Sequence, residues 1–112
     1  MNYSIRAVNS FSKELKKLSK KYKNLKNDYK MFLDLLSTSN PKELGIFLTN
    51  NCYKIRIKNS DNHKGKSAGY RIIYLLIEDE DIVLLSIYSK SDVANISESE
   101  IDKKIIEAIE VL

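Results

Sequence analysis

The chain has 112 residues, 43% of them hydrophobic and 30% charged, values typical of one soluble globular domain. Its single cysteine excludes an internal disulfide framework, and no apolar run approaches the roughly 20 residues of a membrane-spanning helix. Because the first residues also lack the apolar core of a signal peptide, we expect residues 1–112 to form a single cytoplasmic domain that does not enter a membrane.

The charge is distributed unevenly along the chain. The formal net charge is +4, but residues 1–37 contribute +6 and residues 38–77 contribute +5, whereas residues 78–112 contribute −7. A basic surface over the first two thirds suits a polyanionic partner, and nucleic acid is the commonest one. A solvated lysine-rich helix surface with no partner is the alternative.

The first third of the chain predicts a short strand followed by helices. Residues 2–7 fit the strand, and Asn9 or Ser10 fits the N-cap of the helix after it. Apolar side chains then recur at steps of three and four, in two successive sets. The first set is Phe11, Leu15, Leu18, Tyr22 and Leu25, and the second is Leu25, Tyr29, Phe32, Leu33 and Leu36. A bend at residues 23–24 would make a helical hairpin, and one long helix is the alternative; residues 37–41 end the pattern at a proline.

The middle of the chain changes to a period of two, which indicates strands. Residues 53–58 alternate apolar and cationic side chains, and a polar loop follows at 59–69, where Gly65 and Gly69 can adopt backbone angles that other residues avoid. Residues 70–77 form an almost continuous apolar run, as expected of a central strand covered on both faces. The acidic turn 78–81 and the apolar run 82–88 then predict an antiparallel hairpin.

The end of the chain predicts a well-capped helix. Ser97 and Glu100 match a capping box, while Ile96 and Ile101 match a hydrophobic staple. Strand, two helices, three strands and a helix make an α+β domain, with an antiparallel sheet, an N-terminal helical hairpin and a C-terminal helix.

One strand carries a row of positive charges. Lys54, Arg56 and Lys58 are alternate residues, which places them about 6.6 Å apart on one face of a strand. The side chains of such a row do not fill a core, and their positive charges repel one another. The alternative explanation is that charges on an edge strand prevent aggregation. Arg71 lies inside an apolar strand and needs an anionic partner or a cleft, because burying it unpaired is costly. If the two strands pair, Arg71 joins the same basic face.

Three segments in this region resemble toxins of the RelE/ParE superfamily. Residues 52–58 (Cys-Tyr-Lys-Ile-Arg-Ile-Lys) are similar to a strand of RelE-like toxins. Residues 65–74 (Gly-Lys-Ser-Ala-Gly-Tyr-Arg-Ile-Ile-Tyr) are similar to a segment of the HigB-like branch. Members of that branch often have glycine at the position that Ala68 occupies here. Residues 85–90 (Leu-Ser-Ile-Tyr-Ser-Lys), followed by 95–97, are similar to the end of that branch's sheet. The chain lacks the tyrosine or histidine that some members carry near the C-terminus.

The resemblance implies the toxin of a type II toxin–antitoxin pair, with a RelE-like fold. Its expected activity is that of an endoribonuclease that cuts mRNA on the ribosome without a metal ion or other cofactor. Its expected partners are a cognate antitoxin protein, the ribosome and mRNA. In such enzymes the ribose 2′-OH attacks the adjacent phosphate, and Lys, Arg and Tyr side chains supply proton transfer and charge stabilisation. The resemblance places the catalytic side chains at Lys54, Arg56, Arg71, Tyr88 and Lys90, and contacts to RNA or ribosome at Lys58, Lys64 and Lys66.

Two other functions remain open at this point. A ParE-type toxin of the same fold would inhibit DNA gyrase and would not need a phosphate-binding row. A catalytically degenerate relative would bind nucleic acid without cutting it. His63 is the only histidine, so a two-histidine ribonuclease mechanism within one chain is excluded, and one cysteine and one histidine cannot build a zinc site. Cys52 has no histidine near it in the sequence, which favours a structural role.

Overall fold

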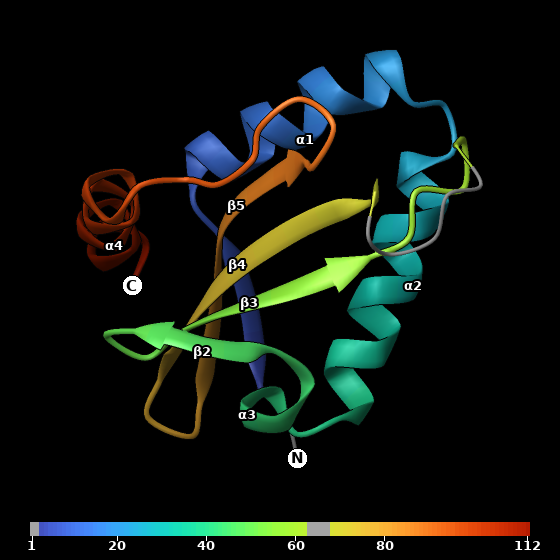
Figure 1. The fold of residues 1–112 in the computed structure, drawn as a ribbon. Coiled ribbons are helices and arrows are strands. Elements are labelled where there is room, and N and C mark those ends of the chain that lie inside the picture. The colour runs from blue at the N-terminus through green and yellow to red at the C-terminus, as the bar shows by residue number, and fades with distance from the viewer. Residues whose placement is uncertain (1–2, 63–67) are drawn as a thin grey trace.

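A five-stranded sheet lies at the centre of the fold, in the order β1-β5-β4-β3-β2 (Figure 1). The computed structural model describes residues 3–62 and 68–112. Along the chain the elements are β1 (Ser4–Ala7), α1 (Asn9–Lys21), α2 (Leu25–Thr38), α3 (Pro41–Leu44), β2 (Ile46–Thr49), β3 (Cys52–Ile57), β4 (Tyr70–Ile77), β5 (Asp81–Ser89) and α4 (Glu98–Val111). The expected α+β class, with N-terminal helices and a C-terminal helix, is confirmed.

The sheet is mixed, which the sequence pattern did not predict. Strands β3, β4 and β5 pair antiparallel as expected, and β2 adds antiparallel to β3, whereas β1 joins the edge of β5 in parallel, with Ser4 opposite Asp81. The sequence also did not reveal α3 and β2. A signal for β2 was present in Asn50 and Asn51, which both have positive φ values of 48° and 62°. Two residues of that conformation make the tight hairpin turn that joins β2 to β3, and asparagine tolerates it well.

Two separate helices form at the N-terminus, and the alternative of one long helix is wrong. The break falls at residues 22–24, where Leu25 donates its N–H to the Tyr22 carbonyl. The predicted N-cap of α1 is also wrong, because Val8 occupies it and has no side chain able to accept a hydrogen bond. The carboxylate of Glu107 in α4 replaces it, accepting from the Ser10 N–H at 2.9 Å and from the Ser10 hydroxyl at 2.6 Å. A negative group at a helix N-terminus also opposes the helix dipole.

The two faces of the sheet are covered differently. On one face Tyr70 packs edge-on against Tyr22, and the Tyr74 hydroxyl donates to the Pro41 carbonyl at 2.7 Å. On the other face Ile73 shares a cavity wall with Ile101 of α4. Residues 70–76 and 82–89 are buried throughout, which confirms the expectation that β4 is covered on both faces.

The C-terminal helix is capped and fixed as the sequence predicts. The Ser97 hydroxyl accepts from the Glu100 N–H at 3.2 Å. A polar network then ties α4 to α1 and β5. Lys104, only 9% exposed, pairs with Glu14 at 2.9 Å, and Glu14 also accepts from the Ile87 N–H at 3.2 Å. This network holds α4 beside the sheet.

Candidate active site

Three of the candidate catalytic side chains form a row across the middle of the sheet. Arg56 of β3 lies opposite Arg71 of β4, and Arg71 lies opposite Tyr88 of β5. Directly opposed residues project from the same face of a sheet, with Cβ atoms about 5 Å apart. The expected pairing that would bring Arg71 onto the basic face of residues 54–58 is therefore present.

A β-bulge brings Tyr88 onto this face. Up to Leu84, which pairs with Tyr74, the even-numbered residues of β5 share the face of the even-numbered residues of β4. The register then shifts, so that Ser86 pairs with Ile73 and Leu85 is the extra residue. Such an insertion reverses the alternation of the side chains beyond it. Without the bulge, Tyr88 would project toward Tyr70 and Tyr74 and away from Arg71.

Two lysines border this row. Lys54, two residues before Arg56, donates from Nζ to Asn95 Oδ1 at 3.5 Å. Lys90 follows the end of β5, and its Nζ donates to the Ala94 carbonyl at 2.7 Å. Both contacts lie in the segment between β5 and α4, so this segment and the sheet together hold the two ammonium groups. Asn95 was not identified as a functional candidate, because no pattern links it to a strand 41 residues away.

Burial and mutual repulsion affect protonation in this group. Burial, and then the charges of Arg71, Lys90 and Arg56, lower the pKa of Lys54 below the ordinary value for a lysine. Burial raises the pKa of Tyr88, against the opposing effect of Arg71. Lys54 therefore releases a proton more readily than an isolated lysine, while the Tyr88 phenol keeps its proton. Lys54 is therefore suited to act as a base once it is neutral, and Tyr88 is suited to act as a proton donor.

The strand residues have unequal access to solvent. Arg71 is 4% exposed and Tyr88 is 7% exposed, whereas the side chain of Arg56 is exposed. An Arg71 Nη donates to the Tyr70 carbonyl at 3.3 Å. Lys58 is exposed directly after the end of β3. The expected contacts at Lys64 and Lys66, and also His63 and Gly65, lie outside the described residues.

Gly69 is required at its position, but not for an unusual backbone angle. A Cβ placed on Gly69 would lie 2.0 Å from the Ile57 carbonyl oxygen and 3.1 Å from the Asn59 nitrogen. The Gly69 carbonyl also accepts from the Lys90 N–H at 3.0 Å. Close approach of two backbones, and not conformational freedom, explains the glycine here. It lets the entry to β4 pass next to β3, two residues before Arg71.

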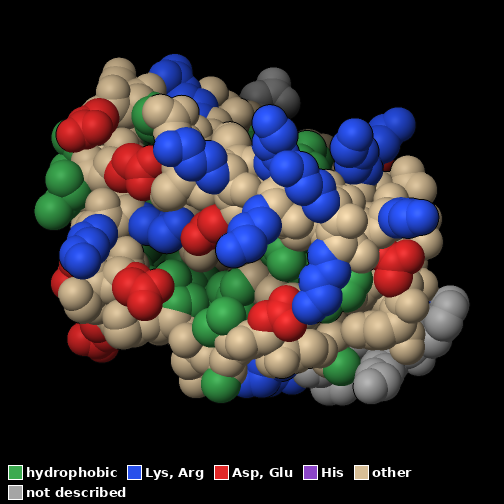
Figure 2. Space-filling view, turned by 90° about the horizontal axis from the view of Figure 1, so that it is seen from above, with side chains coloured by type: hydrophobic (Ala, Val, Ile, Leu, Met, Phe, Trp, Pro, Cys, Tyr) green, Lys and Arg blue, Asp and Glu red, His purple; other side chains and the backbone are tan. Residues whose placement is uncertain are grey.

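The wider surface is basic on the side of α1. Figure 2 looks onto this side and shows Lys and Arg side chains spread across it, with acidic side chains gathered toward the side of α4. The exposed lysines of α1 are Lys13, Lys16, Lys17, Lys20 and Lys21. The charge asymmetry of the sequence is therefore also an asymmetry of the surface.

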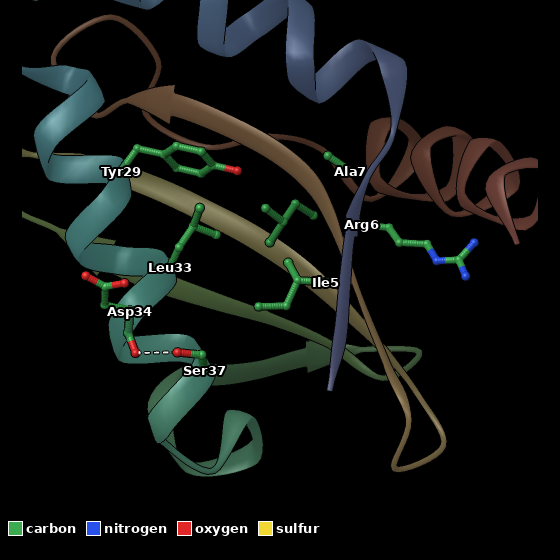
Figure 3. Close-up of a pocket in the computed structure, with 8 residues that line it drawn as sticks. Ile5, Arg6, Ala7, Tyr29, Leu33, Asp34 and Ser37 are labelled. Carbon is green, nitrogen blue, oxygen red and sulfur yellow. Dashed lines mark hydrogen bonds between the residues drawn. The ribbon is translucent and has the colours of Figure 1, made fainter. Parts of the chain in front are cut away.

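Other features of the fold lie apart from this group. A groove of about 400 Å³ between β1 and α2, walled by Ile5, Tyr29 and Leu33, contains none of the expected residues (Figure 3). Within residues 3–62 and 68–112, no three His, Cys, Asp or Glu side chains come together in a way that could hold a metal ion. Among the described helices, none combines the length and apolar character needed to cross a membrane. Cys52 is buried, which raises the pKa of its thiol to about 11 and keeps it protonated.

Comparison with known proteins supports the fold but not a close relationship. No family model and no curated protein matches the sequence. Among solved structures, a double arginine-to-alanine mutant of the E. coli toxin RelE in the free state matches with a TM-score of 0.56. The match covers 100% of this chain and 99% of the RelE chain, at 18% sequence identity. The chain has the fold of a RelE toxin. At this identity the RelE fold alone is shown, and membership of the HigB-like branch stays a prediction.

Proposed function

We propose that the chain is the toxin of a type II toxin–antitoxin pair and acts as a ribosome-dependent mRNA endoribonuclease. The observation that carries the proposal is the row of Arg56, Arg71 and Tyr88, flanked by Lys54 and Lys90, on one face of a RelE fold. Two arginines directly opposite each other repel and destabilise a sheet. A bound polyanion would offset this repulsion.

The proposed reaction needs no group from outside the chain and the RNA. Lys54, as a neutral amine, removes the proton of the ribose 2′-OH. The 2′-oxygen bonds to the adjacent phosphorus, and the bond from phosphorus to the 5′-oxygen breaks. Arg71 and Arg56 neutralise the charge that develops on the phosphorane. The products are a 2′,3′-cyclic phosphate and a free 5′-OH.

The leaving 5′-oxygen must receive a proton, and of the candidates Tyr88 and Lys90 we assign this role to Tyr88. Its raised pKa keeps the phenol protonated, and it lies opposite Arg71. The Lys90 ammonium instead donates to the Ala94 carbonyl, so we assign it to positioning the segment between β5 and α4. Lys58, Lys64 and Lys66 are proposed to contact the RNA backbone or the ribosome.

Dependence on the ribosome follows from the chemistry of the side chains. An amine base and a phenol acid are weak at neutral pH, so the RNA must be held in a near-attack geometry to react. A ribosome that orients the mRNA would supply this. Because the proposed substrate is mRNA on translating ribosomes, we propose that the protein acts in the cytoplasm.

Induced expression combined with mapping of RNA ends tests the proposal. We expect new 5′-OH ends within translated regions, in vivo and in a purified translation reaction, and little cutting of the same transcript without ribosomes. Equal cutting of free and ribosome-bound RNA would contradict ribosome dependence. Growth arrest with intact mRNA and broken or unreplicated DNA would instead indicate a ParE-type gyrase inhibitor, and no arrest would indicate a degenerate relative.

A further inference from the structure

A second cavity, of about 170 Å³, adjoins the proposed catalytic group, which consists of Lys54, Arg56, Arg71, Tyr88 and Lys90. Lys54 and Tyr88 form part of its wall, so the cavity begins where the reacting phosphate is proposed to lie. Its other walls come from the end of β2, from β4 and from the first turn of α4. This volume is well below the roughly 300–1,000 Å³ of pockets for drug-sized ligands, and it suits a single planar ring system.

The inner wall and the rim of this cavity differ in chemistry. Leu48, Ile73, Ile96 and Ile101 supply apolar surface, against which a flat ring can pack. The polar groups are Thr49, Asn95 and Glu98. Asn95 and Glu98 are exposed, and Asn95 uses its Oδ1 to accept from Lys54, which leaves its Nδ2 as a donor. An apolar wall with a few polar groups at the rim is the composition of a ligand site.

We infer that this cavity binds the nucleobase next to the scissile phosphate and prefers a base with an exocyclic amino group over uracil. The inference rests on the proposed function. The ionised carboxylate of Glu98 can only accept hydrogen bonds. Guanine, adenine and cytosine each present an amino group to it, whereas uracil presents carbonyl oxygens on both sides of its one N–H. Those oxygens would face the carboxylate unpaired.

A structural role at the start of α4 could also explain Glu98, and the experiment must distinguish that role from base recognition. Glu98 is the first residue of α4, where a negative charge interacts favourably with the helix dipole. A purely structural role would change the melting temperature when Glu98 is replaced and would leave base preference unchanged. A role in recognition would change the preference between bases.

The experiment compares CMP and UMP, two nucleotides of equal size that differ in the amino or carbonyl group at position 4. Each is titrated into the ¹⁵N-labelled full chain to millimolar concentration, and the backbone amides of residues 48–49 and 95–98 are followed by NMR. We expect both nucleotides to shift amides near Lys54 and Arg71 through their phosphates. We expect CMP to bind at least about fivefold more tightly than UMP, as one base-edge contact provides.

Two variants identify the group responsible. Glu98→Gln, whose amide can both donate and accept, should reduce the CMP preference to less than about twofold. Glu110→Gln removes the same charge from an exposed position near the other end of α4 and should keep the preference. Equal binding of CMP and UMP to the unmodified chain, or the absence of shifts at residues 48–49 and 95–98, would overturn the proposal. An unchanged preference in Glu98→Gln would overturn the role of Glu98.

The measurement requires neither a ribosome nor cleavage. A chain that prefers CMP but cuts no mRNA would retain the base site and contradict the nuclease proposal. A chain that cuts mRNA but does not distinguish CMP from UMP would support the nuclease proposal and contradict the base site.

Discussion

Arg56 and Arg71 face each other directly across the β3–β4 ladder. Two guanidinium groups in this arrangement repel each other, and both of them, together with Lys90, lower the pKa of the neighbouring Lys54. The Arg71 side chain is also almost completely buried, which is costly for a charged group. The proposed role of this pair, the stabilisation of a phosphate and its transition state, needs two positive charges held close together in this way.

Arg71 provides the most direct test of the catalytic assignment. We expect Arg71→Ala to lower ribosome-dependent cleavage by at least about 100-fold, because one transition-state charge contact contributes roughly 3 kcal/mol. Arg71→Met, which keeps most of the packing and removes a repelled, buried charge, should show the same loss of cleavage with a melting temperature no lower than that of the unmodified chain. Lys103→Ala, an exposed cation on α4, serves as the control and should cut normally. Normal cleavage by a folded Arg71 variant would contradict the assignment.

The lowered pKa of Lys54 predicts a pH dependence. If the neutral amine is the base, the cleavage rate should rise with pH and level off above the pKa of Lys54, which lies below that of an ordinary lysine. The side-chain ¹⁵N resonance of Lys54 should titrate at lower pH than that of Lys103. In Lys90→Gln, which removes a neighbouring positive charge, the Lys54 pKa should move upward.

The same shift has a consequence for stability. Because the folded state holds the Lys54 proton less tightly than the unfolded state, protonated Lys54 opposes folding. Its penalty is present below the folded pKa and decreases as pH rises toward the unfolded pKa. Lys54→Met should therefore unfold at a higher denaturant midpoint than the unmodified chain at pH 7, and this difference should shrink at alkaline pH. A constant difference over this range would contradict the shift.

Glu14 is expected to be important for stability. Its carboxylate accepts from Lys104, from Ser86 at 3.2 Å and from the Ile87 N–H. Glu14→Ala would leave Lys104 largely buried without its carboxylate partner, a change that costs about 3–5 kcal/mol in a fully buried pair. The loss here should be about 2 kcal/mol, because 34% of the Glu14 side chain is exposed. Denaturant unfolding measures it.

An exposed ion pair in the same chain is the matched control. Lys21 and Asp92 also pair at 3.0 Å, but their side chains are 57% and 40% exposed. Lys21→Ala should cost under about 1 kcal/mol. Adding Lys104→Met to Glu14→Ala should recover part of the loss, since the double variant no longer buries an unpaired charge. Equal effects of Glu14→Ala and Lys21→Ala would contradict the importance of the network.

Gly69 should tolerate no side chain. Gly69→Ala places its Cβ against the Ile57 carbonyl, so the two strands must separate next to Arg71. We expect a loss of about 3 kcal/mol or more, at the upper end of the range for overpacking. Ala68→Gly, one residue earlier, should cost less than about 1 kcal/mol. A Gly69→Ala protein as stable as the unmodified chain would contradict the close approach.

The proposed antitoxin is expected to mask the catalytic group. An acidic helix or extended segment complements the positive charges of Lys54, Arg56 and Arg71, and it would fold on binding. In the complex, hydrogen exchange should slow at residues 54–58 and 88–90. If these residues exchange as in the free chain while α1 and α2 become protected, the antitoxin instead excludes the ribosome sterically.

The sequence by itself predicted the elements whose patterns are local. Periods of three to four placed α1 and α2, alternation placed β3, and the capping box at Ser97 and Glu100 placed α4. Alternation along β3 also identified Lys54 and Arg56, and the apolar run of β4 identified Arg71, whereas Tyr88 and Lys90 were named from the resemblance to RelE-like toxins. These signals lie within one element, where the spacing of residues determines which side chains share a face.

Only the tertiary structure decided how distant parts of the chain meet. The parallel pairing of β1 with β5 and the contact between Lys54 and Asn95 join residues far apart in sequence. The bulge at Leu85 has no local signature, yet it places Tyr88 on the face of Arg71. Periodicity reports the faces of each strand separately, whereas register and bulges are set by how whole strands pack together. The sequence therefore predicted the residues of the candidate site and the meeting of Arg71 with the face of Arg56, whereas the position of Tyr88 on that face came only from the tertiary structure.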